Sequence, residues 1–189
     1  MSLDRFLQRK TAVLSKLDKS SIGKWDTKIK PLCDKLNSLN DFYTTSSCSG
    51  RIVLMIEQEK KENDLFLKVW HYKISLAVLK KALKEFVNIK KIIKFKFESP
   101  IIHVACKDLK KTSEILEKAK HIGFKRSNLI TFGKNIFLEL NSTEKLEFPI
   151  IKNGRILVDD IFLELIVEIS NKKLEKGWDK IRKLEKEIE

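Results

Sequence analysis

Residues 43–56 read Y-T-T-S-S-C-S-G-R-I-V-L-M-I, a run of small polar residues followed by an apolar run. The apolar part, Ile52–Ile56, is typical of a buried strand. The hydroxyl side chains before it compete with the backbone for hydrogen bonds, and Gly50 permits dihedrals that other residues avoid. We therefore expect a polar turn that leads into a strand. Arg51 adds five donors in a fixed fork, so the turn suits an anion or polar ligand, although an ordinary surface turn has the same composition.

Hydrophobic periodicity on both sides of this stretch predicts a chain of alternating helices and strand pairs. Pro31 fits the second helix only close to its start, because an interior proline removes a hydrogen bond. The expected helices cover Leu3–Leu17, Ile29–Leu39, Ser75–Val87, Leu109–His121 and Ile161–Ile188. The expected strands cover Arg51–Glu57, Leu65–His71, Ile92–Phe97, Ile101–Cys106, Ser127–Phe132, Asn135–Asn141 and Leu146–Ile151, with the first two forming a hairpin across the loop Glu59–Asp64.

This order of elements predicts an α+β fold with mixed or antiparallel sheets and flanking helices. A strand pair followed by a basic helix occurs twice, which suggests a duplicated unit. The six glycines include no G-x-G-x-x-G, so we do not expect a Rossmann fold. The length of 189 residues suits one compact domain over residues 1–189.

The C-terminal region predicts one long helix that begins near Asp159 and Asp160. Paired carboxylates can bind a metal, but before an apolar run an N-cap is the simpler interpretation. The positions expected to be buried are Ile161, Phe162, Leu165, Ile166 and Ile169, and then Leu174, Trp178, Ile181, Leu184 and Ile188. The second group could pack on the body of the protein or on another copy, and we expect a monomer.

Composition limits the partners and the compartment. A formal charge of +13 and a pI near 9.6 favour an acidic partner such as nucleic acid, although lysine-rich composition also accompanies thermophilic origin. The lysines of residues 80–96 and 107–126 are the expected electrostatic track for RNA.

Cys33, Cys48 and Cys106 form no C-x-x-C pair, so we expect no metal site and a reducing cytoplasm. No apolar run approaches eighteen residues, which argues against a membrane span.

Several motifs together resemble one family. They are Phe6 with Arg9 and Lys10, L-S-K-L-D-K-S-S-I-G-K-W-D at 14–26, Y-T-T-S-S-C-S-G-R-I at 43–52, V-W-H at 69–71, K-F-K-F-E-S-P-I-I-H-V at 94–104, G-F-K-R-S at 123–127 and Asn171-Lys172. In this order they resemble the wybutosine-synthesizing tRNA methyltransferase family, which includes the third enzyme of the eukaryotic pathway and its archaeal counterpart. The resemblance covers about residue 6 to residue 173.

The resemblance implies transfer of a methyl group from S-adenosyl-L-methionine to nitrogen 4 of a tricyclic 4-demethylwyosine-type base next to the anticodon of tRNA-Phe. The residues expected at the site are Ser46, Ser47, Ser49, Gly50 and Arg51 for the cofactor, His71 and Asp26 for the proton, and Lys10 and Trp70 for the RNA substrate. Arg51 could pair with the carboxylate of the cofactor or with that of the base's aminocarboxypropyl chain.

Each of these residues also has an ordinary structural role. His71 can be a structural histidine, Asp26 a helix cap and Lys10 a solvated lysine. Cys48 is not expected to act as a nucleophile, because nitrogen methylation requires no enzyme adduct. The alternative function is that of a noncatalytic basic RNA-binding protein in which the serine-rich turn holds a phosphate.

Overall fold

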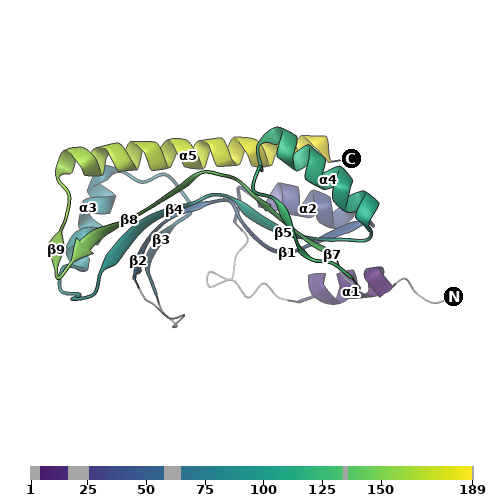
Figure 1. Ribbon diagram of the computed structural model, residues 1–189, viewed down its shortest axis with the longest axis horizontal. Helices are drawn as coiled ribbons and strands as arrows, with labels where there is room; N and C mark the ends of the chain where they lie inside the picture. Colours follow the sequence, from purple (N-terminus) through teal and green to yellow (C-terminus); the bar gives the residue numbers. More distant parts are fainter. Residues whose placement is uncertain (1–4, 17–25, 58–64, 134–135, 189) are drawn as a thin grey trace. The chain divides into compact units, whose positions relative to one another are not determined.

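The computed structural model describes residues 5–16, 26–57, 65–133 and 136–188 (Figure 1). The predicted loop Glu59–Asp64, residues 17–25 of the motif at 14–26 and the outer ends of the predicted first helix lie outside these residues. The chain forms two compact units. The first unit comprises residues 1–49, 100–143 and 177–189, and the second comprises 50–99 and 144–176. The single domain expected from the sequence stays a prediction.

The first unit contains a four-stranded antiparallel sheet in the order β1-β5-β7-β6. Its strands are β1 (Phe42–Cys48), β5 (Ile101–Cys106), β7 (Ile136–Asn141) and β6 (Asn128–Thr131). Helices α2 (Lys30–Ser38) and α4 (Leu109–Ile122) cover one face of this sheet, and α1 (Arg5–Leu14) lies on the other (Figure 1). Phe6 of α1 contacts Tyr43 of β1 with the ring centroids 5.2 Å apart. The sheet face on the α1 side is therefore covered at the Tyr43 end of β1.

The second unit contains a five-stranded antiparallel sheet in the order β3-β2-β4-β8-β9. Its strands are β3 (Phe66–Trp70), β2 (Arg51–Ile56), β4 (Ile93–Glu98), β8 (Lys145–Lys152) and β9 (Arg155–Ile156), and its helix is α3 (Leu76–Glu85). Strand β4 alternates strictly, since Ile93, Phe95 and Phe97 are fully buried whereas Lys94 and Lys96 are only half-buried. This alternation is expected for a strand with one face on the core.

Helix α5 (Asp160–Glu187) belongs to the second unit as far as Lys176 and to the first unit from Gly177 onward. The backbone N–H of Phe162 donates to a carboxylate oxygen of Asp159 at 2.9 Å, so the N-cap interpretation is confirmed. The buried seam of the second half of the helix is also confirmed. The buried residues of that seam are Leu174, Trp178, Ile181, Leu184 and Ile188.

The buried face predicted for the start of α5 is confirmed at Ile166 but wrong at Ile161, Phe162 and Leu165, which are exposed. Leu163, Ile166 and Val167 are buried, whereas Ile161 is 79% exposed and Leu165 is 48% exposed. Apolar residues occupy nearly every position from Ile161 to Val167, so the periodicity of that segment leaves the face undetermined. The side chains that are buried are those in line with Leu174 and the buried seam of the second half of the helix.

Two further expectations need correction, and one hairpin was missed. Residues 42–48 are strand β1, paired in register with β5, and the bend is confined to Ser49 and Gly50, where Gly50 has φ of 100°. Tyrosine and threonine favour strands, which explains why these residues pair with β5. The strands β4 and β5 lie in different sheets and are not a pair, so the second copy of the proposed duplicated unit does not form. The β8–β9 hairpin was missed although its turn, Asn153-Gly154, is a strong hairpin signal.

The predicted fold class is confirmed, since both sheets are antiparallel and are flanked by helices, of which α5 is the longest in the described part of the chain. Pro31 lies in the first turn of α2, as predicted. Ser75 and Asp108 cap α3 and α4, and Gly123 ends α4 in the left-handed conformation. Within the described ranges, every helix is too short or too polar to cross a lipid bilayer.

Candidate functional site

The predicted site residues fall into both units, because the unit boundary runs between Ser49 and Gly50. Asp26, the three serines and Lys10 belong to the first unit. Gly50, Arg51, Trp70 and His71 belong to the second.

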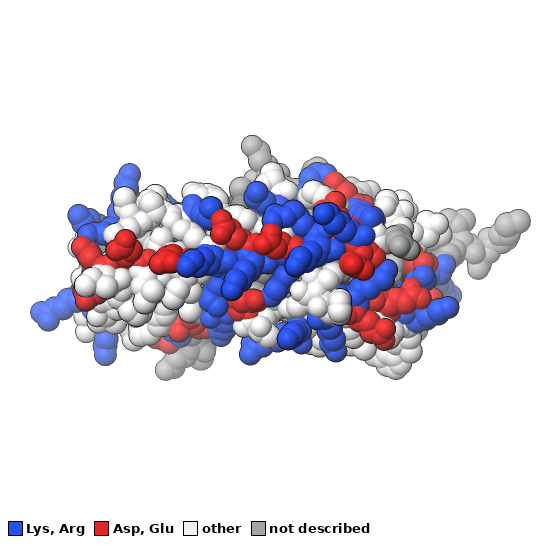
Figure 2. Space-filling view, turned by 90° about the horizontal axis from the view of Figure 1, so that it is seen from above, with Lys and Arg blue, Asp and Glu red and all other residues white. Residues whose placement is uncertain are grey.

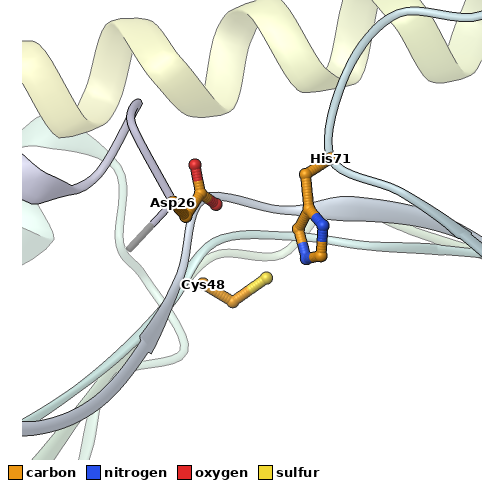
Figure 3. Close-up of side chains that lie close together, drawn as sticks. All are labelled: Asp26, Cys48 and His71. Carbon is orange, nitrogen blue, oxygen red and sulfur yellow. The ribbon is translucent and has the colours of Figure 1, made fainter. Parts of the chain in front are cut away.

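In the first unit, Asp26 holds the bend that follows β1. One carboxylate oxygen accepts the backbone N–H of Ser49 at 2.9 Å, and the other accepts the N–H of Lys28 at 3.1 Å. A carboxylate oxygen of Asp26 also lies within 4.8 Å of the Cys48 sulfur, and Figure 3 shows both side chains. Asp26 therefore has a structural role in the bend. The structural role that the sequence suggested for it was that of a helix cap.

The serines of β1 and of the bend after it point in different directions. Ser47 lies on the α2 side, where its Oγ is 3.4 Å from the Cys33 sulfur. Ser49 is fully buried, and its Oγ has no hydrogen-bond partner among the described residues. An unpartnered buried hydroxyl is unusual, because each such group loses the free energy of its hydrogen bonds to water. The bend therefore retains an unused hydrogen-bonding group beside Gly50.

Ser46 is exposed and belongs to a row of polar side chains that sequence analysis missed. Its Oγ lies 2.7 Å from Nδ1 of His103, and Nε2 of His103 lies 3.1 Å from a carboxylate oxygen of Glu139. Ser46, His103 and Glu139 are register partners on the adjacent strands β1, β5 and β7. The sequence placed His103 inside a strand but predicted no strand at Ser46. If residues 42–48 are recognised as a strand that pairs with β5, the register of this pair links Ser46 to His103.

Lys10 is the one charged residue of α1 that is buried. Its ammonium group donates a hydrogen bond to the backbone carbonyl of Leu39. Burial lowers the pKa of Lys10, and the nearby Asp41 carboxylate partly opposes this effect. The predicted contact of Lys10 with the RNA substrate stays a prediction, and it would require the ammonium group to exchange the Leu39 carbonyl for a phosphate.

In the second unit, Arg51 is half-buried and makes two contacts. Its Nε lies 2.6 Å from a carboxylate oxygen of Glu98, its register partner on β4. The guanidinium carbon also lies 4.8 Å from the centroid of the Phe66 ring. A guanidinium held by a carboxylate and a ring has a restricted orientation, and its terminal nitrogens provide further donors for a ligand.

The end of β3 places Trp70 and His71 next to each other with different exposure. Trp70 is 2% exposed and pairs in register with Ile52, so the predicted stacking on a base would require its packing to open. His71 is partly exposed and follows the strand (Figure 3). The segment after His71 is anchored by Asn171 of α5, whose side chain accepts the Ile74 N–H at 3.0 Å and donates to the Ile74 carbonyl at 2.8 Å.

The open face of the five-stranded sheet carries a network of charges. Lys94 pairs with Glu57 at 2.5 Å, and Lys145 pairs with Glu147 at 2.8 Å. These contacts raise the pKa of Lys94, chiefly through Glu57, and lower the pKa of Glu147, chiefly through Lys145. A depression of about 600 Å³ lies over these residues. Because its charges already neutralise one another, this face is a weaker anion site than its lysines suggest.

The predicted lysine tracks contain both paired and unpaired cations. Lys80 pairs with Asp160, and Lys111 pairs with Glu114. Figure 2 shows basic side chains interspersed with acidic ones on the face that carries α5. Among the described residues, the exposed cations of these tracks with no acidic partner are Lys81, Lys84, Lys90, Lys91, Lys110, Lys120, Lys125 and Arg126.

Comparison with known proteins shows similarity over nearly the whole chain. Residues 8–189 match the family model described as methyltransferase TYW3. A Thermococcus sibiricus protein named tRNA(Phe) 7-((3-amino-3-carboxypropyl)-4-demethylwyosine(37)-N(4))-methyltransferase is 35% identical over 186 residues, which cover 97% of this chain and 93% of the relative. A Methanocaldococcus jannaschii protein of the same name is 36% identical, with 91% of each chain covered.

The fold is also similar to solved structures. The PH1069 protein from Pyrococcus horikoshii matches with a TM-score of 0.87 and 33% identity, covering 96% of this chain and 92% of the other. A hypothetical protein from Aeropyrum pernix has a TM-score of 0.74 at 24% identity, covering 86% of this chain and 96% of the other, and it supports the fold alone.

Proposed function

The chain belongs to the methyltransferase TYW3 family, and on this premise we propose that it methylates nitrogen 4 of a 4-demethylwyosine-type base in tRNA(Phe), with S-adenosylmethionine as donor. The observation that carries the proposal is the match of the family model to residues 8–189, which include the bend after β1 and every proposed site residue. The names of two archaeal relatives supply the substrate. The net charge of +13 is compatible with an RNA substrate.

The residues around the bend fit the chemistry of S-adenosylmethionine. This cofactor presents an ammonium group, a carboxylate and two ribose hydroxyls, and when bound it supplies an electrophilic methyl group. The exposed hydroxyl of Ser46, the unpartnered hydroxyl of Ser49 and the fork of Arg51 are groups that bind such a molecule. We assign the cofactor to Ser46, Ser47, Ser49, Gly50 and Arg51.

Little chemistry is required of the protein beyond alignment. A ring nitrogen attacks a sulfonium methyl in line, so holding the two reactants together without water supplies much of the rate. His71 and Asp26 remain candidates to accept the proton of the nitrogen, and Lys10 and Trp70 remain candidates to contact the RNA. Both oxygens of Asp26 already accept hydrogen bonds from backbone N–H groups, so a proton on Asp26 would break one of these hydrogen bonds.

The experiment that tests the function uses tritiated S-adenosylmethionine and tRNA purified from a strain that lacks this gene. We expect label to enter the tRNA and to be recovered in one tricyclic nucleoside after digestion. tRNA from the complemented strain is the matched control, because its base is already methylated. Tight tRNA binding without transfer of label would instead support the noncatalytic RNA-binding protein.

A further inference from the structure

Three side chains on adjacent strands of the first unit form a directional hydrogen-bonded row, Ser46–His103–Glu139. The distances are 2.7 Å from Ser46 Oγ to His103 Nδ1 and 3.1 Å from His103 Nε2 to a Glu139 oxygen. The imidazole is thus held on both nitrogens, which leaves its ring one orientation. The row ends at Ser46, which is exposed, whereas the side chains of His103 and Glu139 are 30% and 26% exposed.

The partners determine which nitrogen of His103 carries the proton. An ionised carboxylate can only accept hydrogen bonds, so Nε2 must donate to Glu139. In the neutral imidazole Nδ1 is then the acceptor, and the Ser46 hydroxyl donates to it. The lone pairs of Ser46 Oγ are left to accept a hydrogen from a ligand. A serine arranged in this way can accept a proton from outside and pass its own proton inward.

We propose that Ser46, His103 and Glu139, rather than His71 or Asp26, form the proton relay of the methyl transfer, an inference that rests on the proposed function. As the ring nitrogen of the base forms its bond to the methyl carbon, the bond between that carbon and sulfur breaks. The proton of the attacking nitrogen passes to Ser46 Oγ, and the Ser46 hydroxyl proton passes to His103 Nδ1. The imidazolium is stabilised by Glu139 and later releases its proton to water at the exposed sheet face.

The simpler alternative is a solvated polar row without a chemical role. Partly exposed polar pairs of this kind contribute little to stability, so their removal should leave the fold intact. A chemical role should therefore be separable from a structural one. Ser46 is the catalytic residue of the relay, and His103 and Glu139 act through it.

The test measures kcat and KM for Ser46→Ala, His103→Ala and Glu139→Gln, with unfolding curves for each. Asn128→Ala is the matched control, since Asn128 is exposed and is the register partner of Glu139 on β6. We expect kcat to fall by about 100-fold or more in the first two variants, the usual contribution of general base catalysis, and by less in Glu139→Gln. The KM values of His103→Ala and Glu139→Gln should change by about twofold at most, as they should for an interaction made only in the transition state. In Ser46→Ala the KM for S-adenosylmethionine should rise as well, because Ser46 is also assigned to the cofactor, and the fall in kcat is the readout of the relay.

The effect of added imidazole on kcat provides a second test, because imidazole would not restore kcat if the role of His103 were only structural. It should restore at least part of kcat to His103→Ala and none to Ser46→Ala. Normal kcat in His103→Ala, or a raised KM with unchanged kcat, would overturn the relay while leaving the methyltransferase function in place. Absence of transfer by the unaltered protein would overturn both.

Nuclear magnetic resonance of the imidazole nitrogens tests the geometry without the reaction. At pH 8 we expect the His103 signals to show a protonated Nε2 and an unprotonated Nδ1. Of the three histidines, His103 is identified by the loss of its signals in His103→Gln. The opposite tautomer would contradict the relay even if methyl transfer were observed.

Discussion

For Arg51, the sequence predicted a ligand-binding role and the structure adds contacts within the protein. The sequence indicated a guanidinium for an anionic ligand, and the structure gives it Glu98 at 2.6 Å and the Phe66 ring at 4.8 Å. Both contacts restrict the guanidinium before any ligand arrives. A group that is oriented in advance loses less conformational entropy on binding.

Replacement of Arg51 tests its proposed role in cofactor binding. Arg51→Ala should lower kcat/KM by about 10-fold to 100-fold, the equivalent of a lost charge-assisted hydrogen bond of about 1.5–3 kcal/mol. Arg51→Lys should recover part of the loss, because it keeps the charge but not the fork. Methyl transfer and thermal unfolding of both variants provide the measurement. Lys145→Ala serves as the control, and near-normal turnover of Arg51→Ala would reject the assignment.

The cysteines differ in their expected reactivity. Burial raises the pKa of Cys33 to about 11 and that of Cys106 to about 11, although side-chain hydrogen bonding with Ser47 and Thr112 partly opposes the shifts. A raised pKa keeps the thiol protonated, so the reactive thiolate is scarce until the pH approaches 11.

We therefore expect iodoacetamide at pH 8 to modify Cys33 and Cys106 much more slowly in the folded protein than in guanidinium. Cys48 is partly exposed and should react first. Mass spectrometry of digested protein at several times gives the three rates. Equal rates at the three cysteines of the folded protein would show that the two buried thiols are accessible.

Among the elements, α5 contributes two anchoring residues. Asn171 satisfies both backbone groups of Ile74, a residue that is itself 4% exposed. Gly177 allows close approach within the first unit, since a Cβ there would lie 2.8 Å from Cγ of Pro100. Asn171 thus anchors the segment after β3 in the second unit, and Gly177 lies close to Pro100, the residue before β5, in the first.

Loss of the Asn171 amide should destabilise the protein. Asn171→Ala leaves a buried N–H and a buried carbonyl unpaired, which costs about 1–3 kcal/mol for each such group. Because the anchored segment begins after His71, kcat should fall as well. Denaturant unfolding and kinetic assays measure both effects, with Lys172→Ala at the neighbouring exposed position as control. Unchanged unfolding of Asn171→Ala would contradict this role.

Gly177→Ala tests the close approach of α5. Alanine favours a helix by about 1 kcal/mol over glycine, so an exposed site would be stabilised. Here overpacking against the proline ring should cost about 1–3 kcal/mol, and the net change should be destabilising. Thermal unfolding of Gly177→Ala and of the exposed control Lys176→Ala gives the comparison. A higher melting temperature for Gly177→Ala would show that the ring can move away.

For the whole molecule, the excess of positive charge should govern RNA affinity. The charge of +13 is partly compensated locally, as in the pairs Lys30–Asp34 and Lys172–Glu168, both at 2.5 Å. Cations without such a partner in the described part of the chain include Lys120, Lys125 and Arg126 near the end of α4. These three should release counterions when they contact phosphates.

The salt dependence of tRNA binding tests this expectation. Between 50 and 200 mM salt the affinity should fall by about tenfold or more, whereas binding of S-adenosylmethionine should change little. Alanine at Lys120, Lys125 and Arg126 together should reduce the slope of log K against log salt by up to about 3. The matched control replaces Lys30, Lys80 and Lys172, which are ion-paired. Equal slopes for the two triple variants would exclude this surface from the RNA interface.

Local patterns were enough to predict the helices, most strands and the α+β class. Capping residues such as Ser75 and Asp108, and alternation such as that of Ile93–Phe97, are properties of adjacent residues, so they can be read without the fold. The buried face of α5 at Ile161–Val167 could not be predicted as a whole, because nearly every position of that segment is apolar and only packing selects the buried ones.

The sequence by itself determined the family, the residue types of the proposed site and the positive charge, since motifs and composition do not depend on distant contacts. Only the tertiary structure decided that residues 42–48 are a strand, that β4 and β5 belong to different sheets and that Ser46 meets His103. Ser46 and His103 are 57 residues apart in the chain, and the register of two paired strands brings them together. No turn joins β1 to β5, so their register is set by which face of each strand is buried, and that depends on the packing of the whole sheet.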